Sequence, residues 1–97
     1  MTIKWNKTAI KQLLDIIQYI EENDFENYAE TLEKEILARI RVLPGTHSHQ
    51  SLDRFKLNND GSYRAFEVDR YRISLRVLTT EIRILRIRHT SRLPRQF

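Results

Sequence analysis

The sequence contains no cysteine, and only two glycines and two prolines among its 97 residues. The absence of cysteine excludes a disulfide framework and thiol chemistry. No apolar run approaches the roughly 20 residues of a membrane-spanning helix, and the first residues lack the apolar stretch of a signal peptide. We therefore expect a cytoplasmic protein with no membrane partner, folded as a single domain over residues 1–97.

Lysine is nearly absent from the second half of the chain, where Lys56 is the only one after residue 43. Residues 1–43 carry six basic and eight acidic side chains, a net charge of −2, whereas residues 44–97 carry eleven and five, a net charge of +6. Ten of these eleven basic residues are arginines. Because a guanidinium group fits phosphate and carboxylate oxygens, this half predicts contact with nucleic acid or an acidic protein, or else only a well-solvated surface.

Two stretches repeat apolar residues at helical spacing and predict amphipathic helices. The first covers residues 7–22 and follows Asn6, a candidate N-cap. The second covers residues 25–43, with Asp24 as its candidate N-cap, and ends at Pro44–Gly45. The short connection between them predicts an antiparallel helical hairpin.

Period-two alternation elsewhere predicts strands, and the polar NNDG sequence at residues 58–61 predicts a turn. The expected strands are residues 2–5, 63–68, 71–77 and 81–89, with 54–57 as a further short candidate. Tight connections join the last three strands, so we expect an antiparallel meander. The order is β-α-α-β-β-β, which indicates an α+β fold with the helical hairpin packed on an antiparallel sheet.

A two-residue loop at Asp69–Arg70 would fix which side chains share a face, because directly opposed residues point to the same side. The apolar face, which must take the helices, then consists of Phe66, Val68, Tyr71, Ile73, Leu75 and Val77. The open face consists of Tyr63, Ala65, Glu67, Arg72, Ser74 and Arg76. On it, Glu67 faces Arg72, and the two form a plausible cross-strand ion pair.

The register of the last strand has two alternatives. If Val77 pairs with Ile82, the open face gains Arg83, Leu85, Ile87 and His89, and His89 lies diagonal to Arg72. With a three-residue loop, the open face gains instead Ile82, Ile84, Arg86 and Arg88. Both registers leave exposed apolar residues rimmed by arginine, which is typical of a surface that a partner covers.

The element order, with YRISLRV at residues 71–77 and ILRIRHTSRLP at residues 84–94, resembles the RelE/ParE superfamily. Its members are the toxin halves of bacterial type II toxin–antitoxin pairs. The resemblance covers about residues 3–94 and closes on a His-x-x-Arg pair, His89 and Arg92. It implies a small, commonly acidic cognate antitoxin that neutralises the toxin, with operator DNA contacted only indirectly through the antitoxin. RelE-like members cleave messenger RNA, usually on the ribosome, whereas ParE-like members poison DNA gyrase.

Metal-independent RNA cleavage needs a base for the 2′-hydroxyl, a cation for the phosphate and an acid for the leaving 5′-oxygen. If the chain is RelE-like, Glu67, Arg72 and His89 are the candidates for these three roles. Their alternative roles are structural: an ion pair between Glu67 and Arg72, and a strand-end histidine.

The sequence lacks the late tyrosine that many RelE-like nucleases keep, since Thr90 follows His89 and no tyrosine comes after Tyr71. This absence and the closing His-x-x-Arg favour the ParE-like branch, which has no enzymatic activity, over a ribosome-dependent RNA endonuclease. The third alternative is an inactive toxin relic that only binds an antitoxin.

The remaining candidate site residues are assigned to partners. Leu85 and Ile87 are candidates for antitoxin binding. The candidates for binding the target, whether gyrase, ribosome or nucleic acid, are Arg64, Arg76, Arg83, Arg86, Arg88 and Arg92. We expect no cofactor, and the isolated pair His47 and His49 is too little to predict a metal site.

Overall fold

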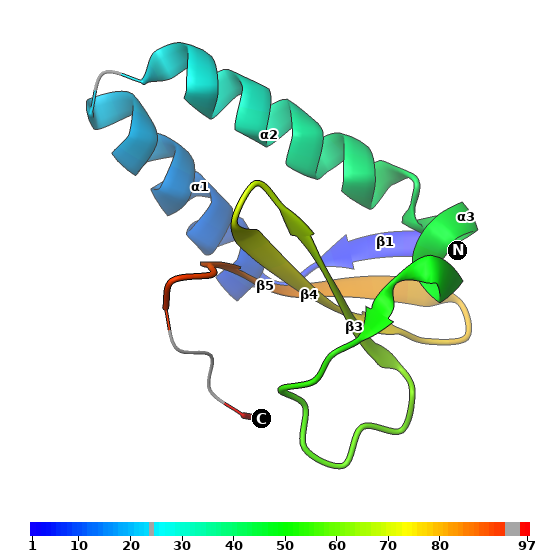
Figure 1. Cartoon of the computed structure of the whole chain (residues 1–97). Helices are drawn as coiled ribbons and strands as arrows, with labels where there is room; N and C mark the ends of the chain where they lie inside the picture. Colours follow the sequence, from blue (N-terminus) through cyan, green and yellow to red (C-terminus); the bar gives the residue numbers. More distant parts are fainter. Residues whose placement is uncertain (24, 93–95) are drawn as a thin grey trace.

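The computed structural model describes residues 1–23, 25–92 and 96–97. Its helices are α1 (Lys7–Glu22), α2 (Glu26–Arg41), the short α3 (Leu43–Thr46) and one 3-10 turn, η1 (His47–His49). Its strands are β1 (Thr2–Trp5), β2 (Ser51–Leu52), β3 (Tyr63–Val68), β4 (Tyr71–Val77) and β5 (Glu81–His89). The predicted α+β order is confirmed, with helices packed on a sheet (Figure 1).

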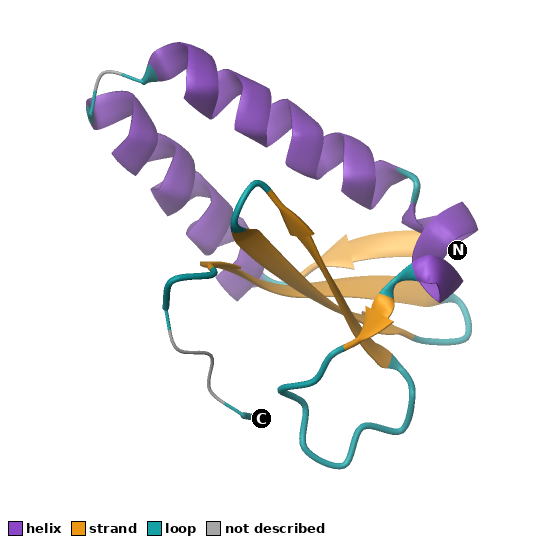
Figure 2. Ribbon diagram, viewed as in Figure 1, coloured by secondary structure: helices purple, strands orange, loops and turns teal. Residues whose placement is uncertain are grey.

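The strands form one sheet in the order β1-β5-β4-β3-β2. The antiparallel meander of β3, β4 and β5 is confirmed. The sheet is nevertheless mixed, because β1 joins β5 in parallel, with Ile3 opposite Ile82. The expectation of a wholly antiparallel sheet is wrong here, because the helical hairpin leads to β2 at the opposite edge, which runs opposite to β1. Three reversals from β2 through β3 and β4 then leave β5 running in the direction of β1. Figure 2 shows α1 and α2 together on one side of the sheet.

The helical hairpin forms much as its sequence predicts. Asn6 caps α1, because its Oδ1 accepts a hydrogen bond from the Ala9 amide at 2.8 Å. The residue Asp24, expected to cap α2, lies outside the described residues, and Phe25 occupies the N-cap position. The second helix ends at Arg41, slightly earlier than expected, and Pro44 lies in the first turn of α3, where its missing N–H costs nothing.

The core lies between the hairpin and the predicted apolar face of the sheet. The helices contribute their i, i+3, i+4 residues: Ala9, Leu13, Ile17, Ile20, Ala29, Leu32, Ile36 and Ile40. The sheet contributes the buried residues Phe66, Val68, Ile73 and Leu75. Tyr71 and Val77 are partly buried and pack against this core. Each buried Leu or Ile side chain contributes about 1.5–3 kcal/mol relative to exposure, so this face fixes how the sheet sits.

The last strand contains a β-bulge. Val77 pairs with Ile82 and Leu75 with Ile84, but the next residue of β4, Ser74, pairs with Arg86. Leu85 is therefore an extra residue in β5, without a direct partner on β4.

The bulge divides β5 between the two predicted registers. Before it, Arg83 lies on the open face as in the first register; after it, Arg86 and Arg88 lie there as in the second. Ile87 and His89 lie on the helix side, opposite Ile73 and Tyr71, so the prediction of an open-face position for them is wrong. The physical reason is spacing. Ile82, Ile84 and Ile87 are all buried, and strict alternation could bury only the first two.

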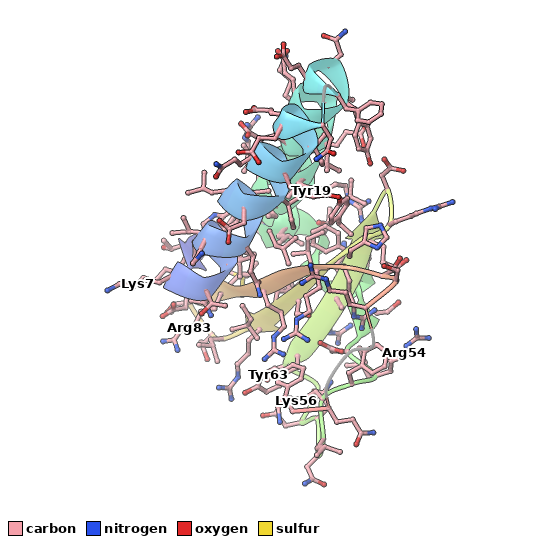
Figure 3. The ribbon with its side chains drawn as sticks, turned by 90° about the vertical axis from the view of Figure 1, so that its left-hand side faces the viewer. Lys7, Tyr19, Arg54, Lys56, Tyr63 and Arg83 are labelled. Atoms are coloured by element: carbon pink, nitrogen blue, oxygen red, sulfur yellow. The ribbon has the colours of Figure 1, made fainter. Side chains whose placement is uncertain are left out.

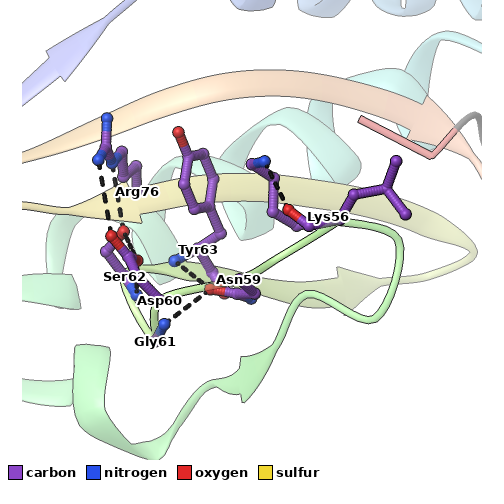
Figure 4. A network of polar contacts seen from close by, with 8 residues as sticks. Lys56, Asn59, Asp60, Gly61, Ser62, Tyr63 and Arg76 are labelled. Carbon is purple, nitrogen blue, oxygen red and sulfur yellow. Dashed lines mark hydrogen bonds and ion pairs between the residues drawn. The ribbon is translucent and has the colours of Figure 1, made fainter.

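The segment between η1 and β3 is largely irregular, as expected, but the candidate strand at residues 54–57 is wrong. The short strand lies earlier, at Ser51–Leu52, and pairs with β3. Asn59 holds the following loop, because its amide donates to the carbonyls of Asp53 and Tyr63 and its Oδ1 accepts from the Gly61 and Tyr63 amides (Figure 4). The positive φ of Gly61, 97°, confirms the predicted turn chemistry.

The two-residue loop between β3 and β4 is confirmed, since Val68 pairs with Tyr71. Asp69 and Arg70 both have positive φ, 45° and 70°, as a type I′ turn requires. The Tyr28 hydroxyl donates to the Asp69 carboxylate and ties this turn to α2. That hydrogen bond, with a smaller effect of burial, raises the pKa of Tyr28 to about 12.

Candidate functional site

The open face of the sheet carries most of the predicted site residues. Strands β3, β4 and β5 present there Tyr63, Ala65, Glu67, Arg72, Ser74, Arg76, Arg83, Arg86 and Arg88. Figure 3 shows Lys56 and Tyr63 close together on the far side of the sheet from α1, which carries Tyr19. The arginine-rich face is thus separate from the helical hairpin.

Arg72 contacts two carboxylates, of which only that of Glu67 was predicted. Its guanidinium contacts Glu67 at 3.8 Å, but its closer partner is Asp53, at 2.9 Å. The Asp53 side chain is 1% exposed and that of Arg72 16%, whereas Glu67 is 51% exposed. Asp53 also accepts a hydrogen bond from the Phe55 amide. The buried pair with Asp53 therefore fixes Arg72, and Glu67 is a secondary contact.

Sequence reasoning missed Asp53, because the expected strand at 54–57 left it without a position on the sheet. The one available signal is an acidic residue that follows the apolar Leu52 in an otherwise basic half of the chain. The second carboxylate oxygen of Asp53 has no hydrogen-bond partner among the described residues. A cavity of about 20 Å³ beside Asp53, Ser74 and Arg86 has room for one water, which is the usual way that such an oxygen is satisfied.

Aromatic rings cover three of the open-face arginines, and sequence reasoning missed this too. The guanidinium of Arg72 lies 4.9 Å from the Phe55 ring, that of Arg76 lies 4.7 Å from Tyr63, and that of Arg86 lies 4.1 Å from Phe97. Phe55 belongs to the loop that precedes β3, Tyr63 is the first residue of β3, and Phe97 lies at the end of the chain. Such cation–π contacts stabilise a guanidinium away from water.

Three of the predicted target-binding arginines are engaged within the molecule. Arg64 lies on the helix side and donates to the carbonyls of Ser48, Gln50 and Gly61, so it is a clamp for the irregular segment. Arg76 donates to Ser62 and lies 3.9 Å from the carboxylate of Asp60 (Figure 4). Arg83 pairs with Glu81 at 3.1 Å.

Three others have no carboxylate partner within the part of the chain that the structure describes: Arg86, Arg88 and Arg92. Arg86 is partly buried, and this burial, followed by the charge of Arg88, lowers its pKa. The uncompensated charge of the open face is therefore concentrated on β5.

His89 lies in a groove between α1 and the ends of β4 and β5, not on the open face. Its ring packs edge-on against Tyr71, with centroids 5.1 Å apart. Its Nδ1 accepts a hydrogen bond from the Ser91 amide at 3.0 Å, so the neutral ring carries its proton on Nε2. Arg92 lines the same groove and brings the closing His-x-x-Arg pair together there.

The two candidates for antitoxin binding, Leu85 and Ile87, differ in their exposure. Ile87 is 1% exposed and belongs to the core, so its expected place on an open binding surface is wrong. Its amide donates to the Gln12 side chain of α1 at 2.7 Å, which supports the strand just after the bulge. Leu85, the bulged residue, is half-exposed, and its assignment to antitoxin binding stays a prediction.

Of the three catalytic candidates, Glu67 and Arg72 are in contact on the open face, whereas His89 lies on the opposite side of the sheet. Within the described residues no group of three or more metal-ligating side chains comes together, His47 and His49 included. None of the helices in the described part of the chain is long and apolar enough to span a membrane.

Comparison with known proteins identifies the family. The model of the ParE toxin family, from type II toxin–antitoxin systems of the parDE kind, matches residues 3–94. The match covers nearly the whole chain, and the protein therefore belongs to this family of toxins. As the toxin of such a system, it pairs with a cognate antitoxin.

The fold agrees with this assignment. A solved structure described as the chromosomal ParDE toxin–antitoxin system from P. aeruginosa superposes with a TM-score of 0.71 at 20% sequence identity. The alignment covers 92% of this chain and 95% of the other. No curated protein matches the sequence.

Proposed function

We propose that this ParE-family toxin arrests growth by binding and inhibiting DNA gyrase, without cutting RNA. The observation that carries the proposal is the separation of His89 from Glu67 and Arg72 by the thickness of the sheet. An acid on one face cannot protonate the leaving oxygen of a phosphodiester that is held by a base and a cation on the other, because proton transfer needs hydrogen-bond reach.

The state of Arg72 gives further support. A phosphate clamp must offer unused donors to the developing charge. Here the guanidinium is held by the buried carboxylate of Asp53 and covered by the Phe55 ring. An incoming phosphate would have to displace a buried ion pair, and that leaves Asp53 without a partner.

The groove that holds His89 and Arg92 is the better candidate for target contact. It combines the exposed ring of Tyr19 with Tyr71, His89, Arg88 and Arg92, and aromatic and arginine side chains are the residues that anchor protein interfaces. We infer that Arg88 and Arg92 meet gyrase, that Leu85 belongs to the antitoxin contact, and that operator DNA is reached only through the antitoxin.

The test is a supercoiling assay with purified gyrase and the folded toxin. We expect inhibition that rises with toxin concentration and is reversed by the cognate antitoxin. Two variants test which surface contacts gyrase. Arg92→Ala should weaken inhibition about tenfold or more, because Arg92 lies in the proposed contact groove. Arg83→Ala is the control, since Arg83 is paired with Glu81, and it should leave inhibition unchanged. Unimpaired supercoiling at a large excess of folded toxin, together with cleavage of translated messages, would support the RNA endonuclease instead.

A further inference from the structure

The outer side of α1 carries two large apolar side chains that the described part of the chain leaves uncovered. Ile10 and Leu14 lie one helical turn apart and are 44% and 62% exposed. Their neighbours Leu13 and Ile17 are buried in the core, so the exposed pair widens the apolar face of the helix beyond the fold itself. Scattered exposed apolar residues are ordinary, but this pair stands between two ordered charges.

Opposite charges flank Leu14 at equal distances along α1. Lys7 lies seven residues before it and Glu21 seven residues after it, so all three share one side of the helix, because seven residues make two turns. Lys7 extends outward from the start of α1 (Figure 3). Neither charge has an ion-pair partner within the described residues, whereas the nearby Lys11 and Asp15 pair with each other at 2.8 Å.

The spacing of these residues is that of a coiled-coil seam. Lys7, Ile10, Leu14, Ile17 and Glu21 follow one another at alternating intervals of three and four residues. We call the exposed members, Lys7, Ile10, Leu14 and Glu21, the α1 stripe. Because its middle is apolar and its ends carry opposite charges, the stripe is complementary to a copy of itself that runs in the opposite direction. A two-fold axis at Leu14 brings Lys7 of each copy to Glu21 of the other.

The α1 stripe is separate from the candidate target contact. Gln12 and Tyr19 project from a different side of α1, where they line the groove that holds His89 and Arg92. The arginine-rich face of the sheet lies away from the helices. Two chains joined through the α1 stripe would therefore leave both grooves and both open faces uncovered.

We propose that the α1 stripe is a self-association surface, through which two copies of this chain pair by antiparallel packing of their α1 helices. The stripe spans about 21 Å, since each residue of a helix rises 1.5 Å. One helix packed on its copy makes a smaller contact than a standard interface, so the pair forms and separates readily. The two exposed ion pairs set the orientation more than the affinity, which comes from Ile10 and Leu14.

The test is sedimentation velocity of the purified full chain across a wide range of concentration. We expect a sedimentation coefficient that rises from the value of a monomer toward that of a dimer. Leu14→Ala should weaken the association about tenfold or more, because Leu14 lies at the centre of the contact. The matched control is Phe25→Ala, which removes a side chain that is similarly exposed, at 63%, but lies outside the α1 stripe. It should leave the association unchanged.

Exchange of the charges tests the antiparallel orientation. Lys7→Glu and Glu21→Lys each bring like charges together in the pair and should weaken association, while circular dichroism shows an unchanged fold. The double variant restores both ion pairs in an antiparallel pair, but not in a parallel one, and should associate like the intact chain.

Three results would overturn the proposal. The first is an intact chain that stays monomeric at every concentration, and the second is association that Leu14→Ala does not weaken. The third is a double variant that associates no better than the single ones. A monomeric chain whose binding of the cognate antitoxin depends on Leu14 would assign the α1 stripe to the antitoxin instead. None of these measurements involves gyrase, so the result is independent of the gyrase proposal.

Discussion

At the scale of single residues, the buried ion pair of Asp53 and Arg72 organises the open face. Asp53→Ala would leave a largely buried guanidinium without its closest carboxylate, and we expect a loss of roughly 2–3 kcal/mol in the free energy of unfolding. The matched control is Glu67→Gln, which removes the exposed contact of the same arginine and should cost less than about 1 kcal/mol. Urea denaturation measures both. Equal losses would show that Asp53 is not the principal partner.

A second residue-scale prediction concerns Tyr28. Its hydrogen bond to Asp69 raises its pKa from the usual 10.0 to about 12, so ultraviolet titration should show that Tyr28 ionises well after an ordinary tyrosine. Burial raises the pKa of Tyr71 as well, so Tyr28 is identified by its response to substitution of Asp69. Because the folded pKa is the higher one, the contact stabilises the fold fully below pH 10 and loses its contribution as the pH rises toward 12. Asp69→Asn should move this late transition back toward 10, and a titration unchanged by that substitution would contradict the assignment.

Single residues also show where sequence reasoning stops. The pairing of Glu67 with Arg72 follows from strand register and was predictable. The dominant partner, Asp53, was not, because it lies in an irregular segment whose path depends on Asn59 and on the fold of the sheet beneath it. The same holds for Phe55 and Phe97, whose rings reach the arginines only through loop geometry.

At the scale of elements, the bulge in β5 decides which face each residue takes. Ile87→Gln would bury an amide in the core and should cost about 3 kcal/mol or more, whereas Arg88→Gln, on the next residue, places the same side chain on the open face. We expect thermal unfolding to show a large drop in Tm for Ile87→Gln and a small one for Arg88→Gln. The opposite order would mean that β5 alternates without a bulge.

The helices, the three long strands and the two-residue length of the β3–β4 loop were predictable, because the apolar periods that define them are local. The bulge was not, since the sequence alone allows two registers and the structure uses one before Leu85 and the other after it. The bulge allows Ile82, Ile84 and Ile87 all to be buried, and this burial favours it over either uninterrupted register. The stabilisation from this burial requires the helices that cover these side chains. The displacement of His89 to the helix side follows from the same shift.

At the scale of the whole molecule, charge is unevenly placed. The first 43 residues carry a net charge of −2 and the remainder +6, and β5 concentrates the arginines without carboxylate partners within the described chain. An anionic partner should therefore be steered to this side. We expect the association rate with gyrase to fall about tenfold or more between low and high salt, measured by stopped-flow mixing. A rate that does not depend on salt would contradict a role for this charge.

The central claim is that this ParE-family toxin acts by binding gyrase and not by cutting messages. The most direct measurement expresses the chain alone in a bacterial host and follows plasmid supercoiling and the 5′ ends of an abundant translated message in the arrested cells. The account predicts arrest with loss of negative supercoiling and intact messages. Arrest with new, codon-phased 5′ ends and unchanged plasmid topology would contradict it.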